Sequence, residues 1–154
     1  LFTQLALHRW EMQIIRTENF LVSQTDEALL KEIAPGKNRI IYLLGHLIAV
    51  NDAMITLLGL GERSYAHLDE TFIKNPDKSG LEMPEASVLR SDWKKSNAQL
   101  SALFNQLPPK EWFAKHTAMT EEDFVKTPTR NRLNVLLNRT GHVAYHLGQM
   151  VLAK

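Results

Sequence analysis

The stretch T-G-H-V-A-Y-H-L-G-Q-M, Thr140–Met150, is the most informative part of this sequence of 154 residues. It places His142 and His146 four residues apart, and Gln149 three residues after the second histidine. On a helix, which turns about 100° per residue, these three side chains lie on one stripe. Two imidazoles one helical turn apart can share a metal ion. The stretch therefore predicts either part of a metal site or two ordinary core histidines.

The segment around this stretch, from about Thr129 to the end of the chain, has the spacing of an amphipathic helix. Its core residues are expected on a second stripe, roughly a quarter turn away from the histidines. The members of that stripe are Leu133, Leu136, Leu137, Thr140, Ala144, Leu147 and Val151. The zincin motif H-E-x-x-H is excluded because position 143 is Val, so the helix lacks the general base of that motif.

A third histidine, His46, lies in the most apolar segment of the chain. This segment is expected to form a helix from about Asn38 to Leu58 that ends at Gly59. Because the helix is apolar nearly all round, it is expected to be buried on more than one side, together with His46. His46 would then complete a three-ligand site with the pair on the last helix. Tyr42, one turn before His46, is a candidate proton donor, and a buried structural tyrosine is the alternative.

Glycines accompany all three histidines: Gly45 precedes His46, Gly141 precedes His142, and Gly148 follows His146 by two residues. A glycine inside a helix costs roughly 1 kcal/mol relative to alanine. We expect close helix approach, or space for an imidazole, a metal and a substrate, to compensate. Simple tight packing of Gly141 and Gly148 is the alternative.

The remaining segments predict an all-α protein. Further helices are expected at about 2–22, at 26–33 after a Thr25 cap, and from Pro84 or Glu85 to Gln106. Alternating runs typical of strands are missing. The connection from Gly61 to Met83 is long, which indicates a crossover. The expected fold is a four-helix bundle with one long crossover connection, formed by a single domain over residues 1–154.

The charge balance limits the partners. Lys and Arg number 18 against 17 for Asp and Glu, giving a net charge of +1. That balance argues against a nucleic-acid surface, which usually has a basic excess on one face. No stretch approaches the roughly 20 apolar residues of a membrane span. The charges on the last helix are expected to face solvent: Arg130, Arg132 and Arg139.

Cysteine is absent, so any metal must be bound by His, Asp or Glu. The other histidines lack ligand spacing and are expected on the surface or in connecting segments: His8, His67 and His116. The first residues lack the basic segment and cleavage site of a secretory signal. We therefore expect a cytoplasmic protein.

Two motifs together resemble a known family. L-G-H-L-I-A-V-N-D, Leu44–Asp52, followed much later by G-H-V-A-Y-H-L-G-Q-M, Gly141–Met150, is similar to the DinB-like (YfiT-type) superfamily of metal-dependent enzymes. The resemblance covers essentially the whole chain, and H-x-x-x-H-x-x-Q is its most specific part. It implies a four-helix bundle in which three histidines bind one divalent ion, most often nickel or zinc. Carried over, the ligands are His46, His142 and His146.

The resemblance also implies a range of activities and partners. Known activities in the superfamily include transferases and isomerases that use low-molecular-weight thiols such as bacillithiol or mycothiol. A small-molecule substrate, with such a thiol as one candidate, and a homodimer are therefore expected. Many members have Arg directly after the last histidine, where this chain has Leu147. A positive group near the site is therefore expected to be missing.

The expected function is metal-dependent thiol S-transfer or small-molecule hydrolysis. Three protein ligands leave a coordination position open, as in catalytic rather than structural sites. The metal would lower the pKa of a water molecule toward about 7 or hold a thiolate. Gln149 is expected behind the ligands, holding one of them or a water. The alternatives are a non-catalytic metal- or ligand-binding bundle protein of the stress response, and a bundle without metal whose histidines are satisfied internally.

Overall fold

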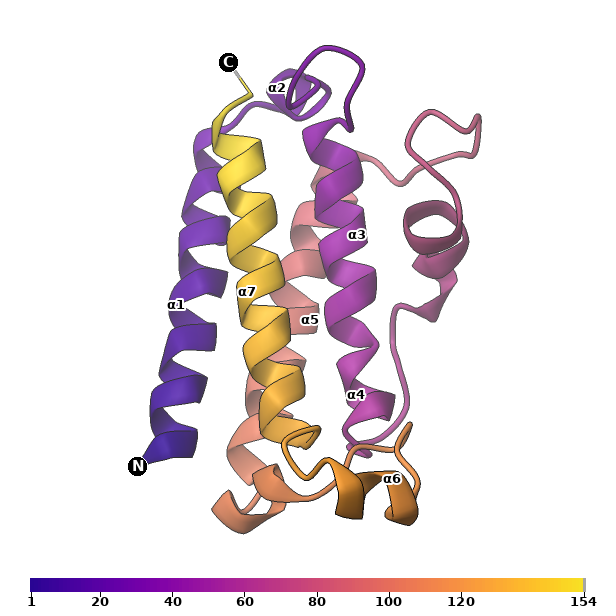
Figure 1. The fold of residues 1–154 in the computed structure, drawn as a ribbon. Coiled ribbons are helices and arrows are strands. Elements are labelled where there is room, and N and C mark those ends of the chain that lie inside the picture. The colour runs from indigo at the N-terminus through magenta and orange to yellow at the C-terminus, as the bar shows by residue number, and fades with distance from the viewer. Residues whose placement is uncertain (154) are drawn as a thin grey trace.

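Four long helices make up most of the protein in a computed structural model that describes residues 1–153 (Figure 1). They are α1 (Phe2–Ser23), α3 (Ile40–Asp52), α5 (Ala86–Gln106) and α7 (Arg132–Val151). Three short helices join them: α2 (Asp26–Leu29), α4 (Met54–Leu57) and α6 (Glu121–Lys126). Among residues 1–153 there is no β-strand, only two isolated β-bridges. The expected all-α fold is confirmed.

The long helices form a bundle of two parallel pairs that run in opposite directions. In Figure 1, α1 and α7 run the same way, α3 and α5 run the opposite way, and α2 caps one end while α4 and α6 lie at the other. The closest pairs are α1 with α7 and α3 with α5. Because α3 and α5 are parallel, the chain must return along the bundle between them. The expected long crossover provides that return.

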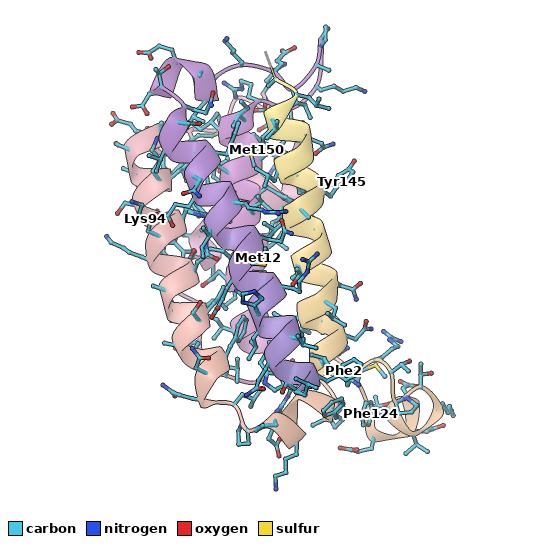
Figure 2. All side chains as sticks on the ribbon, turned by 90° about the vertical axis from the view of Figure 1, so that its left-hand side faces the viewer. Phe2, Met12, Lys94, Phe124, Tyr145 and Met150 are labelled. Atoms are coloured by element: carbon cyan, nitrogen blue, oxygen red, sulfur yellow. The ribbon has the colours of Figure 1, made fainter. Side chains whose placement is uncertain are left out.

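Figure 2 turns the bundle so that α1 lies in front, with α5 on one side and α7 on the other. Lys94 on α5 and Tyr145 on α7 point outward at opposite edges of this view. The interior contains all three tryptophans, each at most 1% exposed: Trp10, Trp93 and Trp112.

Helix α3 is the core helix. Every one of its residues is buried except His46, which is half-buried. Contrary to the expectation that no stretch approaches a membrane span, the segment Ile40–Leu57 is long and apolar enough to cross a membrane by length and composition alone, but 72% of it is buried inside the bundle. This burial is typical of a helix surrounded by other helices, as the apolar sequence predicted.

Two helix boundaries differ from the expected ones. The helix expected to continue to Leu58 is divided at Ala53, whose φ and ψ of −61° and −18° tighten the backbone between α3 and α4. Gly59 then takes a φ of 68° and ends the segment as expected. Helix α7 begins at Arg132 rather than near Thr129 because the Asn131 side chain caps it, accepting a 2.9 Å bond from the amide of Asn134.

The buried stripe of α7 is rotated from the predicted one. Leu133 and Leu136 are buried as expected, but Leu137 and Val151 are 49% and 52% exposed. Val143 and Met150, each 0% exposed, complete the stripe instead. The core face of α7 therefore lies nearer to the histidine stripe than predicted, and the helix packs mainly against α1 and also against α3.

The crossover is held against α3 by two ion-pair groups. At one end Arg39 binds the buried carboxylate of Asp77, with 2.6 Å between Nη2 and Oδ1. At the other end Arg63 joins the buried Asp52 to Asp69, at 3.0 and 2.6 Å. Between them a π-helical turn, Glu70–Lys74, packs Phe72 into the core. The crossover is therefore fixed beside His46, and its backbone can contact that side chain.

Candidate metal centre

Three histidines from two antiparallel helices converge at one point. His46 comes from α3, and His142 and His146 come from α7. Their candidate ligand nitrogens all lie within 4.8 Å of one another. The Nε2 atom of His142 is 3.3 Å from that of His46 and 3.0 Å from that of His146. Within residues 1–153 this is the one group of His, Asp or Glu side chains with such spacing.

Two of the three imidazoles are oriented by acceptors behind them. His46 Nδ1 lies 2.7 Å from the carbonyl oxygen of Phe72, and His146 Nδ1 lies 2.7 Å from Oε1 of Gln149. An oxygen accepts, so each Nδ1 carries the hydrogen and donates it. The lone pair of each ring is then on Nε2, which faces the other histidines. This arrangement is typical of metal-ligating histidines, whose outer nitrogen is held by a carbonyl or carboxamide oxygen.

Gln149 is itself held in place. Its Nε2 donates to the hydroxyl of Tyr145 at 3.0 Å, which turns Oε1 toward His146. Gln149 thus lies behind a candidate ligand, in the position that the sequence suggested.

Tyr42 is placed differently from a proton donor. Its hydroxyl donates to the carbonyl of Asn75 at 2.7 Å, with a longer 3.4 Å contact to that of Phe72. Its ring lies parallel to His46 with centroids 6.4 Å apart. The hydroxyl therefore faces the crossover backbone and not a ring nitrogen of the site, which favours the structural alternative for this residue.

His142 has no support of this kind. Its Nδ1 is buried and has no hydrogen-bond partner among the described residues. Because Nε2 of both His46 and His146 presents a lone pair, two lone pairs approach Nε2 of His142. A single hydrogen on Nε2 of His142 can be donated fully to only one of these two lone pairs. A cation among the three nitrogens would be bound by all of them. The donor set therefore fits a divalent metal that accepts imidazole nitrogen.

The electrostatic environment keeps the three rings neutral. Burial lowers the pKa of His46, His142 and His146, and that of His142 falls to about 4. The positive charges that His146, His46 and Arg139 can carry lower the pKa of His142 further. The hydrogen bonds that His46 and His146 donate to Phe72 and Gln149 raise the pKa of these two rings and oppose the effect of burial only in part. Neutral imidazole is the form that binds a metal.

Arg139 corrects two expectations from the sequence. It was expected to face solvent, and a positive group was expected to be missing from the site. Instead its Nε is buried without a hydrogen-bond partner, burial lowers its pKa, and its charge lowers the pKa of both His46 and His142. Arg132 is also not free, since it pairs with Glu111 at 3.2 Å. Arg130 is exposed, as expected.

The glycines beside the histidines have different roles. A Cβ on Gly45 would lie 2.3 Å from the Phe72 ring, so the expected close approach holds at this position. A Cβ on Gly141 or Gly148 would meet nothing within 4 Å, and both residues are exposed. Neither close packing nor space for a metal explains these two. The prediction was wrong there because both glycines face away from the bundle.

The remaining histidines lie outside the cluster. His8 and His67 are exposed, and His116 is half-buried in the connection before α6. Sequence reasoning missed the Phe72 carbonyl, because a backbone acceptor leaves no side-chain signal. It also misplaced Arg139, although its position three residues before His142 put it on the histidine stripe.

Comparison with known proteins adds one match. A family model described as the DinB superfamily matches residues 9–150. Comparison with curated proteins gave no match. The matched range extends from α1 into the last turn of α7 and contains all three clustered histidines together with Gln149.

Proposed function

The chain belongs to the DinB superfamily, and from this premise we propose that its three-histidine cluster binds one divalent metal ion and acts on small molecules. The ligands are His46, His142 and His146, and nickel or zinc suits a set of three imidazoles. The observation that carries the proposal is the convergence of three Nε2 atoms, two of them oriented from behind.

The proposed reaction is thiol S-transfer or hydrolysis of a small molecule. A bound divalent metal would supply Lewis acidity, lowering the pKa of a water molecule or favouring the thiolate form of a thiol. The chain's own part is to keep the imidazoles neutral and correctly turned, through the Phe72 carbonyl and Gln149. The histidines are half-buried, so a small ligand can reach them from outside.

Thiol transfer is favoured over hydrolysis by the surroundings. Within residues 1–153, the group of side chains that could hold a metal consists of three histidines and includes no carboxylate that could act as a general base. Val143, at the place of the zincin glutamate, is buried in the core. A thiol that binds as the thiolate requires no separate base to remain nucleophilic. A non-catalytic metal- or ligand-binding role in the stress response is the second candidate, and this lack of a base favours it over hydrolysis.

We propose a cytoplasmic homodimer that acts on small molecules, without a nucleic-acid or membrane partner. The near balance of 18 basic and 17 acidic residues argues against a nucleic-acid partner, because it provides no strong basic field. It also favours the homodimer, because like-charge repulsion between two copies is small.

Metal analysis of protein purified without a His tag tests the proposal. The wild type should contain one equivalent of a divalent metal. His142→Ala should abolish stoichiometric binding, whereas His67→Ala, on the exposed crossover, should retain it. Equal metal content in the wild type and the His142 variant would overturn the assignment. Turnover of electrophiles with a panel of cellular thiols then separates an enzyme from a binding protein.

A further inference from the structure

Arg139 is a half-buried cation close to His142 in the chain, and it takes part in no salt bridge among the described residues. It lies on α7 three residues before His142, on the stripe that also carries His146 and Gln149. No carboxylate among residues 1–153 forms an ion pair with it, and its Nε is buried without a hydrogen-bond partner. Each of the other half-buried arginines forms a salt bridge with an acidic side chain. The pairs are Arg39 with Asp77, Arg63 with Asp52 and Asp69, Arg90 with Asp26, and Arg132 with Glu111.

The helical position of Arg139 places it on the histidine side of α7, because residues three and seven positions apart share one face of a helix. The field of Arg139 reaches His142 on its own helix and also His46 on the facing helix. A guanidinium on the outer face of α7 would be screened by solvent from a histidine across the bundle. Arg139 therefore stands about one helical turn from His142, on the face of α7 that carries the candidate ligands.

The site as a whole is short of negative charge. Three neutral imidazoles contribute none, and a divalent metal among them beside Arg139 would leave three positive charges without a protein counter-charge. An unpaired buried charge is costly, and cations close together increase that cost. The bound ligand is the remaining source of compensation. A ligand with one anionic group at the metal and a second at Arg139 would provide it.

We propose that Arg139 is the specificity-determining residue of the site and selects ligands that carry a carboxylate a few bonds from their metal-binding group. This inference rests on the proposed metal centre. A planar guanidinium offers paired donors that match the two oxygens of a carboxylate. A single cation suits a singly charged carboxylate, and the spacing of about one turn suits a short ligand.

The test uses cobalt-loaded protein and pairs of ligands that differ by the carboxylate. 2-Mercaptoethanol and 3-mercaptopropionate each report binding through a sulfur-to-cobalt charge-transfer band. Imidazole and imidazole-4-acetate report through the cobalt d–d bands and need no thiol chemistry. The wild type should bind the carboxylate member of each pair at least about tenfold more tightly, the difference expected for a charge-assisted hydrogen bond.

Substitutions identify the residue responsible. Arg139→Gln should remove this preference by weakening only the carboxylate ligand, and Arg139→Lys should keep part of it. Arg130→Gln, at an exposed arginine on the connection before α7, should change neither affinity. Cobalt content and circular dichroism of each variant show that the centre is intact. Should Arg139→Gln fail to fold, the role of Arg139 is still tested by the preference of the wild type for carboxylate ligands and by its reduction in Arg139→Lys.

The outcomes separate the two proposals. Equal binding within both pairs, or equal weakening of both members in Arg139→Gln, overturns the role of Arg139 and leaves the metal centre standing. A preference in the imidazole pair without any thiol band supports Arg139 and removes thiol transfer from the proposed function. Wild-type protein that takes up no cobalt overturns the metal centre and, with it, the inference.

Discussion

The ring of Phe72 occupies the space where a side chain at position 45 would begin. A Cβ built on Gly45 would lie 2.3 Å from Cε1 of Phe72 and 2.5 Å from two further ring atoms. The same Phe72 supplies the carbonyl that accepts the Nδ1 hydrogen of His46. A glycine that precedes one candidate ligand therefore controls the position of the group that orients it.

Gly45→Ala should destabilise the protein and weaken metal binding. The new methyl group overlaps a buried ring, and overpacking of this kind costs about 1–3 kcal/mol. The higher helix propensity of alanine offsets roughly 1 kcal/mol of that loss. Because Phe72 must move, the hydrogen bond to His46 should lengthen. Denaturant unfolding and competitive metal titration measure the two effects.

Gly141→Ala is the matched control, since this glycine also precedes a candidate ligand on a helix. Its Cβ would meet nothing within 4 Å. The variant should therefore gain about 0.5–1 kcal/mol of stability, because alanine loses less conformational freedom in a helix. A loss of stability in Gly141→Ala equal to that in Gly45→Ala would contradict the role given to Phe72.

Asp77→Asn should loosen the crossover. The Asp77 carboxylate is 2% exposed and accepts bonds from the backbone amide and the side chain of Arg39. Removing its charge leaves a guanidinium without a counter-charge, and we expect a loss of about 1–3 kcal/mol. Glu70→Gln is the control in the same crossover, because the exposed pair of Glu70 with Lys74 contributes at most about 1 kcal/mol. Comparable losses in both variants would count against the anchoring role of Asp77.

The stability of the metal-free protein should decrease as the pH falls from about 7 toward 4. Burial lowers the pKa of His142 in the folded state to about 4. The unfolded chain, with an ordinary histidine pKa of about 6.5, then binds more protons than the folded one between these values. Stability is therefore full above the unfolded pKa and is lost as the pH falls through this window. His46 and His146, whose pKa values burial also lowers, add to the slope.

Unfolding of metal-free protein at a series of pH values measures this dependence. His142→Gln should give a shallower decline between pH 7 and 5, whereas His67→Gln, on the exposed crossover, should leave the profile of the wild type. An unchanged profile in His142→Gln would show that burial of this ring does not determine the acid sensitivity.

The helices and the histidine cluster were predictable because their signals are local. His142 and His146 share a face by spacing alone, and the apolar segment around His46 can be satisfied only inside a bundle. Thr25 caps α2 as its residue type predicted, accepting from the amide of Ala28 at 3.1 Å. Each of these features depends on residues within one or two turns.

The features that could not be predicted depend on how the helices are rotated about their axes and on which backbone groups of the crossover lie beside the site. The histidine stripe of α7 was predicted correctly, but the core stripe lies nearer to it than predicted, and the interpretation of Arg139 failed with it. Phe72 reaches His46 from 26 residues further along the chain through its carbonyl, which every residue type possesses. No pattern of side chains encodes that contact.

We propose that the outer face of α1 and α7 mediates the homodimer. An apolar hollow between the two helices is lined in part by Phe2, Leu5 and Leu137, which are 77%, 55% and 49% exposed. In Figure 2, Phe2 lies at the beginning of α1, and Met12 lies further along the same helix, which is in front in this view. Neighbouring exposed apolar side chains are typical of protein–protein contacts.

Light scattering at micromolar concentration should then give a mass near twice the monomer's 17.6 kDa. Leu5→Glu with Leu137→Glu should shift the protein to the monomer, because charges in a desolvated contact oppose association. Val125→Glu, at an 80% exposed position on α6, should leave the mass unchanged. A wild type of monomer mass contradicts the dimer, and a dimer that survives both leucine changes contradicts the interface.

Val143 stands where a zincin has its catalytic glutamate. Zinc-loaded protein should not hydrolyse peptides, since the described histidine cluster includes no carboxylate that could accept a proton. V143E should not create that activity either. Val143 is 0% exposed and belongs to the buried stripe of α7 with Leu136 and Met150, so a carboxylate there enters the core.

A buried carboxylate without a partner is expected to destabilise the protein by several kcal/mol, or to stay protonated. Thermal unfolding of V143E should therefore show a large loss of stability, relieved in part at acidic pH, where protonation removes the charge. Val143→Ala, which only removes volume, should lose less and show no such relief. If V143E instead kept wild-type stability and gained zinc-dependent cleavage of a peptide, position 143 would face the metal, and the rotation of α7 described above would be wrong.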